Sequence, residues 1–446
     1  MSRGAAVLSA ALLFAEVVVA CGQPSGLELR VVARGLQVPW SVVWAPDGWL
    51  WCTERPGRIL HIHPETGEQR LLLRVPEVLS VSETGLMGLA LHPGFPDTPW
   101  VMVAYTVRGG GGGIELQIVR LRYDPNEDTL QEPQVLLQGI PVGQIHAGCR
   151  LLALPDRTVL VTVGEGGVPQ RSQDLGQLGG KILRIGWEGE IPTDNPLPGS
   201  PIWLWGVRNP QGLARSSSGL LYFSEHGAST DDELNLLERG RNYGWPAVEG
   251  YCDRPQEEQF CRDSNVVEPL YAWTPTVAPC GLAYYPPTGP LEEFRHALLL
   301  ATLKGSTLFC LQLSPDGRSI VTVVPYALGV GRLRDVCVTP EGRVFVSTSN
   351  RDGRGTPREG DDKILELVRA QEVGAQEEPA FGWRAEAGTL RLWASSKGIF
   401  CLFDRRGGCV GCRSGVWETA FPGLAPGAYG VLFVGERVAS RWIVVE

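Results

Sequence analysis

Short apolar runs recur along the chain, and each is followed by a turn and by a second β-rich run that mostly ends in Thr, Ser or Glu. The turn often contains Pro-Asp-Gly or a close variant, as at residues 46–48 and 340–342. Two apolar runs joined in this way predict a pair of neighbouring antiparallel strands. Six copies occur at irregular spacings of roughly 40–70 residues, the range of radial β repeats. They span residues 40–54, 85–106, 147–165, 209–225, 280–304 and 332–349.

These repeats predict an all-β fold. A single blade cannot bury both of its faces, so several blades must close into a ring. The repeats therefore predict a six-bladed β-propeller over residues 26–369, without an amphipathic helix of convincing length. The 56 Gly and 34 Pro residues agree with many tight turns, and a hydrophobic content of 43% is enough for a sizeable core.

Beyond the predicted propeller, residues 370–379 are polar and acidic and predict a linker. Residues 380–446 predict a small C-terminal β domain. Residues 403–407 and 423–429 resemble the Ig-like C-terminal sorting domain of some bacterial secretion systems, and a plain β-sandwich-like appendage is the alternative. The short β patterns of this domain lie at 390–394, 399–403, 429–434 and 442–445.

The first 21 residues have the pattern of a signal peptide. Arg3 supplies the positive charge, and residues 5–20 form an apolar run that Glu16 interrupts and that is too short for a membrane-spanning helix. Residues 18–21 look like a bacterial lipobox, in which Cys21 would be acylated. We therefore expect an exported protein, periplasmic or at the cell surface, with a membrane tether where Cys21 is lipidated.

Export places the chain where disulfides persist. Cys252 and Cys261 flank a polar loop and are a reasonable pair. Cys409 and Cys412 form a lone CxxC without a second CxxC or a well-spaced His, so zinc is weakly supported, and a disulfide or two free thiols is the simpler interpretation. The net charge of −9 argues against non-specific nucleic-acid binding.

Residues 208–246 carry the most specific pattern in the chain. Arg-Asn-Pro-Gln-Gly is followed by a short buried strand at 220–224, then by Ser-Glu-His-Gly, Asp-Asp-Glu-Leu-Asn and Asn-Tyr-Gly-Trp-Pro. Asp231, Asp232 and Glu233 lie in an irregular segment of the kind that supplies calcium with oxygen ligands, although an acid triplet alone is more simply a solvated loop. The full run resembles the soluble sugar dehydrogenases that use pyrroloquinoline quinone (PQQ), the glucose/sorbosone dehydrogenase family.

The resemblance covers about residues 30–368 and implies a PQQ- and calcium-dependent oxidation of the C1 hydroxyl of aldose sugars to lactones. His146 begins His-Ala-Gly-Cys-Arg, at the position of the family's His-x-Gly-Gly-Arg, and would be the general base. Cys149 replaces the second Gly of that motif. Ile145 stands where one branch has an Asp that orients the His, so another group, such as a backbone carbonyl, must fix the tautomer of His146.

The resemblance also implies a set of residues around PQQ, a planar quinone with three carboxylates. Arg332 and Arg334 alternate at the start of a strand and so share one face, where guanidinium groups can pair with carboxylates. Arg208 would stabilise the charge that develops on a quinone oxygen. Glu83 falls where some members carry a Gln near substrate and cofactor, and a simple turn residue is the alternative. The remaining implied contacts are Asn209, Thr276 and Lys304.

Two calcium ions are implied by the same resemblance. One would lie on PQQ and be held by the backbone carbonyls of Gly227 and Ala228, the second of which is often Pro in the family. That ion would polarise the quinone carbonyl as a Lewis acid. A structural ion would use Glu233, the carbonyl of Tyr243 and Asp253.

Two other functions are alternatives to this one. A non-catalytic ligand- or protein-binding propeller has no use for the combination of His146, Arg208, Lys304, Arg332 and Arg334. A calcium-dependent lactonase needs Glu, Asp and Asn side chains from several blades around one metal, and the sequence has no such spaced set. The resemblance thus implies an aldose sugar as substrate, and it leaves the electron acceptor open between a cytochrome and a quinone.

Overall fold

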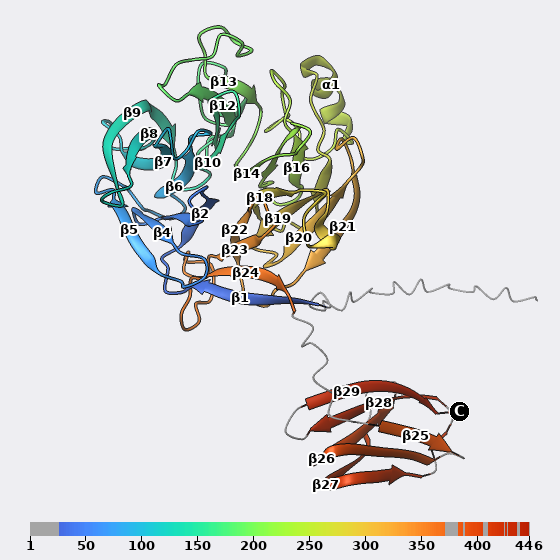
Figure 1. Ribbon diagram of the computed structural model, residues 1–446. Coiled ribbons are helices and arrows are strands. Elements are labelled where there is room, and N and C mark those ends of the chain that lie inside the picture. Colours follow the sequence, from blue (N-terminus) through green and yellow to red (C-terminus); the bar gives the residue numbers. More distant parts are fainter. Residues whose placement is uncertain are drawn as a thin grey trace, which may run out of the picture. The chain divides into compact units, whose positions relative to one another are not determined.

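Six four-stranded antiparallel sheets form the blades of a propeller, as the repeats predict (Figure 1). The computed structural model describes residues 26–370, 382–386, 389–404, 409–422, 424–425, 427–434 and 438–445. The predicted signal peptide with Cys21 and nearly all of the predicted linker lie outside these residues, so both stay predictions. No helix in the described parts of the chain is long and apolar enough to cross a membrane.

Five blades follow the order of the chain, with the first strand of each innermost. The first blade contains β2 (Pro39–Trp44), β3 (Leu50–Glu54), β4 (Arg58–Ile62) and β5 (Gln69–Arg74). The second contains β6 (Leu86–Leu91), β7 (Trp100–Arg108), β8 (Ile114–Asp124) and β9 (Thr129–Val142). The third contains β10 (Gly148–Ala153), β11 (Thr158–Val163), β12 (Lys181–Gly186) and β13 (Ile202–Trp205).

The fourth blade contains β14 (Pro210–Arg215), β15 (Leu221–Glu225), β16 (Asp232–Leu236) and β17 (Tyr271–Trp273). The fifth contains β18 (Pro279–Tyr285), β19 (Ala297–Thr302), β20 (Leu308–Leu313) and β21 (Ile320–Tyr326). The sixth blade joins both ends of the propeller chain, with the order β1-β24-β23-β22. Its strands are β1 (Leu27–Ala33), β22 (Leu333–Val338), β23 (Val344–Thr348) and β24 (Ile364–Arg369).

The ring is closed at its centre, because each inner strand contacts the inner strands of both neighbouring blades, including β22 against β2. The six predicted strand pairs correspond to the first two strands of the six blades, from β2 and β3 to β22 and β23. Apolar side chains fill the space between neighbouring blades. Trp51 and Ile59 of the first blade, for example, pack with Val101 and Val103 of the second. Burying a side chain of this size contributes about 1.5–3 kcal/mol.

One helix was not expected. α1 (Pro255–Ser264) lies between β16 and β17. The propeller also contains two short 3-10 helices, η1 (Pro169–Ser172) and η2 (Glu292–Phe294). α1 begins with a proline, has two acidic residues in its first turn, and buries only Glu257. Its polar surface leaves no apolar stripe for the sequence pattern to reveal. The predicted disulfide is confirmed, and it ties Cys252 to Cys261 within α1.

The C-terminal unit begins after Arg369 and forms one antiparallel sheet. Its long second strand pairs with three others, and two of the predicted short runs are parts of that strand. The strands are β25 (Gly382–Glu386), β26 (Thr389–Asp404), β27 (Cys409–Phe421), β28 (Gly427–Val434) and β29 (Val438–Val445).

The disulfide of this unit differs from the CxxC interpretation. Cys412 is bonded to Cys401, which lies directly opposite it on β26. Cys409 and Cys412 both lie on β27, where three residues of extended chain span about 10 Å. That span exceeds the roughly 7 Å between Cα atoms that a disulfide can bridge. Neither a Cys409–Cys412 bond nor a free thiol at Cys412 is therefore correct.

Candidate active site

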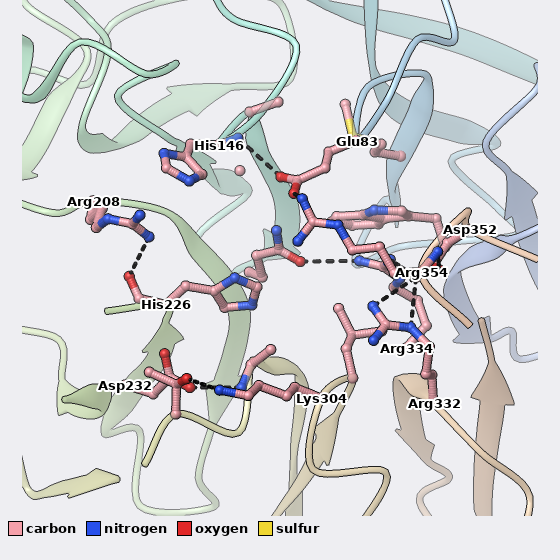
Figure 2. A pocket seen from close by; sticks show the side chains of 18 of the residues that line it. Glu83, His146, Arg208, His226, Asp232, Lys304, Arg332, Arg334, Asp352 and Arg354 are labelled. Atoms are coloured by element: carbon pink, nitrogen blue, oxygen red, sulfur yellow. Dashed lines mark hydrogen bonds and ion pairs between the residues drawn. The ribbon is translucent and has the colours of Figure 1, made fainter. Parts of the chain in front are cut away.

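A cavity of about 340 Å³ lies at the mouth of the central channel where the inner strands begin (Figure 2). Inner strands of five blades contribute to its wall near their first residues. Loops that precede or follow strands supply most of the charged groups of the wall, and strands supply Arg334 and Asp232. Because these loops all extend from the same end of a rigid ring of strands, they bring together side chains that are far apart in the sequence. The inner-strand residues are Trp40, Met87, Gly148, Gln211 and Arg334.

His146 lies in the loop before β10, in left-handed backbone with φ of 55°. Its Nδ1 is 2.7 Å from Oε1 of Glu165, a carboxylate that is only 2% exposed and follows β11. An ionised carboxylate can only accept, so Nδ1 carries the proton and Nε2 is left as an acceptor. The tautomer is therefore set by a carboxylate and not by the expected backbone carbonyl. The sequence reasoning missed Glu165, although it ends the third repeat.

Glu83 links His146 to the opposite side of the cavity. Its Oε2 accepts the backbone N–H of His146 at 3.1 Å, and its Oε1 pairs with Nη2 of Arg354 at 2.7 Å (Figure 2). Glu83 precedes β6, whereas Arg354 lies in the segment between β23 and β24, so the pair joins the second and sixth blades. Arg354 was not predicted, because it lies in an irregular segment rich in Gly and Arg. The ion pair makes Glu83 more than a turn residue.

Arg332 and Arg334 lie together on the wall, as their alternation predicted. Both pair with Asp352, at 2.9 Å and 3.4 Å respectively, and the Asp352 side chain is 3% exposed. Burial alone would raise the pKa of Asp352, but the charges of Arg334 and Arg332 hold that pKa below its ordinary value. Asp352 therefore stays ionised and fixes the two guanidinium groups. Asp352 was another residue that sequence reasoning missed.

Cations outnumber carboxylates on the wall. The carboxylates are Glu83, Asp232 and Asp352. Two of the cations, Arg55 and Arg208, each have a buried Nε without a hydrogen-bond partner among the described residues. Lys304 donates to Oγ1 of Thr276 at 2.6 Å, which brings these two predicted residues together. The cations are Arg55, Arg208, Lys304, Arg332, Arg334 and Arg354.

Arg208 and Asn209 occupy different positions. Arg208 lies on the wall, and its Nη1 donates to the carbonyl of His226 at 3.2 Å. Asn209 is fully buried behind the wall, where its Oδ1 accepts the N–H of Gly148 at 3.2 Å. Its Nδ2 is buried without a partner among the described residues. Arg208 can thus reach a ligand directly, whereas Asn209 supports the loop that carries His146.

A second histidine on the wall, His226, has a different character. Burial, followed by the nearby charge of Arg208, lowers the pKa of His226 to about 3. His226 is therefore neutral at any pH at which the protein would work. A neutral imidazole of such low basicity is a poor proton acceptor. Of the two histidines on the wall, His146 is the one suited to act as a base.

Gly227 and Ala228 lie on the wall in the loop between β15 and β16. Asp232 holds this loop in place, because it accepts the N–H of Gly227 at 2.8 Å and the N–H groups of Val277 and Ala278 at 2.6 Å. A Cβ atom at Gly227 would collide with the carbonyl of Thr230, so only glycine fits. The backbone of this loop is thus fixed at the cavity, where its carbonyls could serve a hard cation.

Glu233 and Tyr243 line a small cleft beside this loop, together with Glu225. Burial is the main cause that raises the pKa of Glu233 to about 7, and it raises that of Glu225 well above its ordinary value. Asp253 is exposed and does not line the cleft. Within the described residues, no group of three or more His, Cys, Asp or Glu side chains is placed to hold a metal ion. The structure therefore brings two of the three predicted structural ligands together.

Comparison with known proteins gives consistent results. The family model described as Glucose / Sorbosone dehydrogenase matches residues 36–365. An uncharacterized protein of Synechocystis is 33% identical, covering 76% of this chain and 87% of its own length. Quinoprotein glucose dehydrogenase B of Acinetobacter calcoaceticus is 30% identical, and the match covers 73% of this chain and 85% of that protein. The PQQ-bound structure of an aldose sugar dehydrogenase from Streptomyces coelicolor is 35% identical, with a TM-score of 0.68 and coverages of 78% and 99%.

Proposed function

We infer the function from a plain premise: the chain belongs to the glucose/sorbosone dehydrogenase family. As a member it is a sugar dehydrogenase, an oxidoreductase. Within that class we propose a PQQ- and calcium-dependent aldose dehydrogenase that oxidises the C1 hydroxyl to a lactone. The observation that carries this proposal is the convergence of an oriented base, His146 with Glu165, and a cationic wall on one cavity.

The wall suits PQQ in charge and in donors. Three carboxylates on the ligand would meet six cationic side chains, of which Arg332 and Arg334 are already held on one face by Asp352. The unpartnered Nε atoms of Arg55 and Arg208 are donors that a bound anion could satisfy. We propose that Arg332, Arg334 and Lys304 pair with the carboxylates. PQQ, when bound, supplies a hydride acceptor.

The residues of the chain then divide the remaining work. Nε2 of His146 takes the proton of the anomeric hydroxyl while the hydrogen on C1 leaves as hydride, so that a C1 carbonyl forms. Glu165 stabilises the resulting imidazolium through Nδ1. Glu83 keeps the His146 backbone in position and offers its carboxylate to sugar hydroxyls. The guanidinium of Arg208 provides positive charge where negative charge develops.

The loop at Gly227 and Ala228 would hold a calcium ion through its carbonyls, which the Asp232 hydrogen bonds keep fixed. Calcium, when bound, supplies Lewis-acid polarisation. For a structural ion, Glu233 and the carbonyl of Tyr243 are the supported ligands, and the exposed Asp253 would have to move to join them. Glu225 lines the same cleft, and a cation would relieve the cost of burying two carboxylates there.

Glu233→Gln is expected to lower the melting temperature in calcium, because an ion that binds only the native state stabilises it by mass action, about 2.7 kcal/mol at 100 times its Kd. A change of 1 kcal/mol in stability shifts the melting temperature by about 2–4 °C, so we expect a decrease of several degrees. Melting curves with and without chelator measure it. Chelation should lower the melting temperatures of the wild type and of the surface control Glu258→Gln equally. It should lower the melting temperature of Glu233→Gln much less. Equal shifts in all three proteins would remove Glu233 from the site.

Arg354→Ala is expected to lower kcat/KM for aldoses a few-fold, because Glu83 loses its ion-pair partner and holds His146 less firmly. The effect is modest, since an exposed pair contributes about 0–1 kcal/mol. Arg354 is 64% exposed, so the melting temperature should not change. Arg354→Lys should restore part of the activity. The control is Arg358→Ala, whose side chain contacts the carbonyl of Gly329. An equal loss in Arg358→Ala would attribute the effect to the segment and not to the ion pair.

The test of the proposed function is a dye-linked assay. The purified protein is loaded with PQQ and calcium, mixed with aldoses, and the reduction of an artificial dye is followed. Aldose-dependent reduction that stops on thorough chelation is expected. Absence of reduction with every aldose, in protein that binds PQQ, would favour the alternative of a non-catalytic binding propeller.

A further inference from the structure

A second cavity, of about 660 Å³, lies at the opposite mouth of the central channel. Its wall comes from later residues of the same inner strands whose first residues line the first cavity. At least one aliphatic side chain from each of the six blades lines it, and we call this cavity the lower cup. Taken one from each blade, they are Val42, Leu89, Leu151, Leu213, Leu282 and Val336.

A buried ion pair lines the lower cup. Nη1 of Arg150 lies 2.8 Å from Oδ2 of Asp335 and 2.9 Å from the hydroxyl of Ser41. The guanidinium of Arg150 also lies over Trp40, at 4.3 Å, and Trp40 lines the first cavity. From Trp40 to Val42 the inner strand rises by two residues, about 7 Å. The two cavities are therefore separated by about one layer of side chains.

The lower cup has the properties of a site for a small organic ligand. Such sites are about 300–1,000 Å³ in volume, mainly apolar, and carry a few placed polar groups. The polar group here is Arg150, which is 6% exposed. Its Nη2 is buried without a hydrogen-bond partner among the described residues. A buried donor without a partner costs about 1–3 kcal/mol, which a ligand oxygen would recover.

Charge selects the class of ligand. Asp335 already neutralises Arg150, so a carboxylate ligand would bring an uncompensated charge into an aliphatic cup. Glu341, which is exposed and lines the cup, would also repel an anion. A carbonyl oxygen can accept from Arg150 without adding charge. The wall thus favours a neutral, mainly apolar molecule with a carbonyl group.

We propose that the lower cup binds a lipophilic quinone, with one quinone carbonyl accepting a hydrogen bond from Arg150. A quinone is also a two-electron acceptor, so the cup gives the dehydrogenase a place for its oxidant. This second role rests on the proposed function. The overall reaction balances: the aldose loses two electrons and two protons to become a lactone, and the quinone gains two of each to become a quinol.

Binding is tested on protein without cofactor, by equilibrium dialysis with a benzoquinone that carries an alkyl tail. One saturable equivalent is expected. Val43→Trp, which fills the cup from its half-buried wall, should weaken binding at least about tenfold, as expected for a lost contact worth 1.4 kcal/mol or more. Val321→Trp, on the exposed outer strand β21 and 66% exposed, is the matched control and should bind normally. Equal binding by both variants, or non-saturable binding, would overturn the site.

Two further arms separate the ligand class and the role. A fatty carboxylate with the same tail should bind more weakly than the quinone, and tighter binding would overturn the proposed class. In the loaded enzyme, Val43→Trp should lose aldose-dependent quinol formation and keep dye reduction. Equal loss of both would overturn the role of the cup as the acceptor site. If the wild type reduces no dye but still binds quinone, the dehydrogenase proposal fails and the binding site stands.

Discussion

His146→Ala is expected to lower kcat with saturating aldose by about 10²–10⁴, the range for a lost general base. The proton of the anomeric hydroxyl would then have no acceptor with the orientation that Glu165 gives to His146. PQQ titration and the melting temperature should stay close to those of the wild type, because Glu165 is the one hydrogen-bond or ion-pair partner of the side chain within the described residues. Steady-state dye reduction measures kcat.

The companion variant is Glu165→Gln. The amide keeps an oxygen that can accept from Nδ1 of His146, but its charge is gone, so the imidazolium is stabilised less. We expect a smaller loss of kcat than in His146→Ala, and a double variant no slower than His146→Ala alone. His63→Ala, at a half-buried turn after β4 and outside the cavity, is the control. Wild-type kcat in His146→Ala would remove this residue from the mechanism.

Replacing Arg332 and Arg334 together by Ala is expected to weaken PQQ binding by about 10²–10⁴. Each charge-assisted hydrogen bond contributes about 1.5–3 kcal/mol, and two are lost. The change would also leave Asp352 buried without its cationic partners, which is destabilising in itself. The measured protein is therefore the triple variant that also carries Asp352→Asn. Fluorescence titration with PQQ gives the Kd.

Asp352→Asn alone is the matched control for that experiment. It removes the negative charge that pairs with both guanidinium groups, so PQQ should bind at least as tightly as to the wild type. A triple variant that titrates like Asp352→Asn would mean that the cofactor lies elsewhere. If the triple variant melts well below the control, both PQQ titrations are repeated at a temperature at which both proteins are folded.

The inner part of the fold could be predicted from the sequence because each blade repeats one local pattern, an apolar strand, a turn and a second apolar strand. The outer strands carry less of this signal. β5, for example, has only three apolar residues between polar ones, and the apolar residues of β21 are mostly exposed or half-buried. α1 is polar on nearly every side. In β26 the pattern revealed two runs, but whether they join into one strand depends on pairing with β27 and β28.

The site could be predicted where its residues sit in short motifs, as with His146, Arg208, and the alternating pair at 332 and 334. The groups that orient them could not. His146 precedes the hairpin of β10 and β11 and Glu165 follows it, so the whole hairpin separates them in the sequence. Arg354 of the sixth blade pairs with Glu83 of the second blade. No spacing along the chain specifies these contacts, since the closed ring creates them. Asp253 illustrates the reverse case, a residue close to a motif in sequence but absent from the cleft.

The sixth blade sets an order on synthesis. β1 is the first propeller strand to leave the ribosome, yet its partner β24 is the last, and Leu27 pairs with Arg369. Until then β1 has no sheet, and the growing blades present open edges that invite association with other chains. The nascent chain must therefore be kept from aggregating until almost all of the propeller has been synthesised. A chain stopped before residue 364 would lack the closing strand altogether, however complete its first five blades.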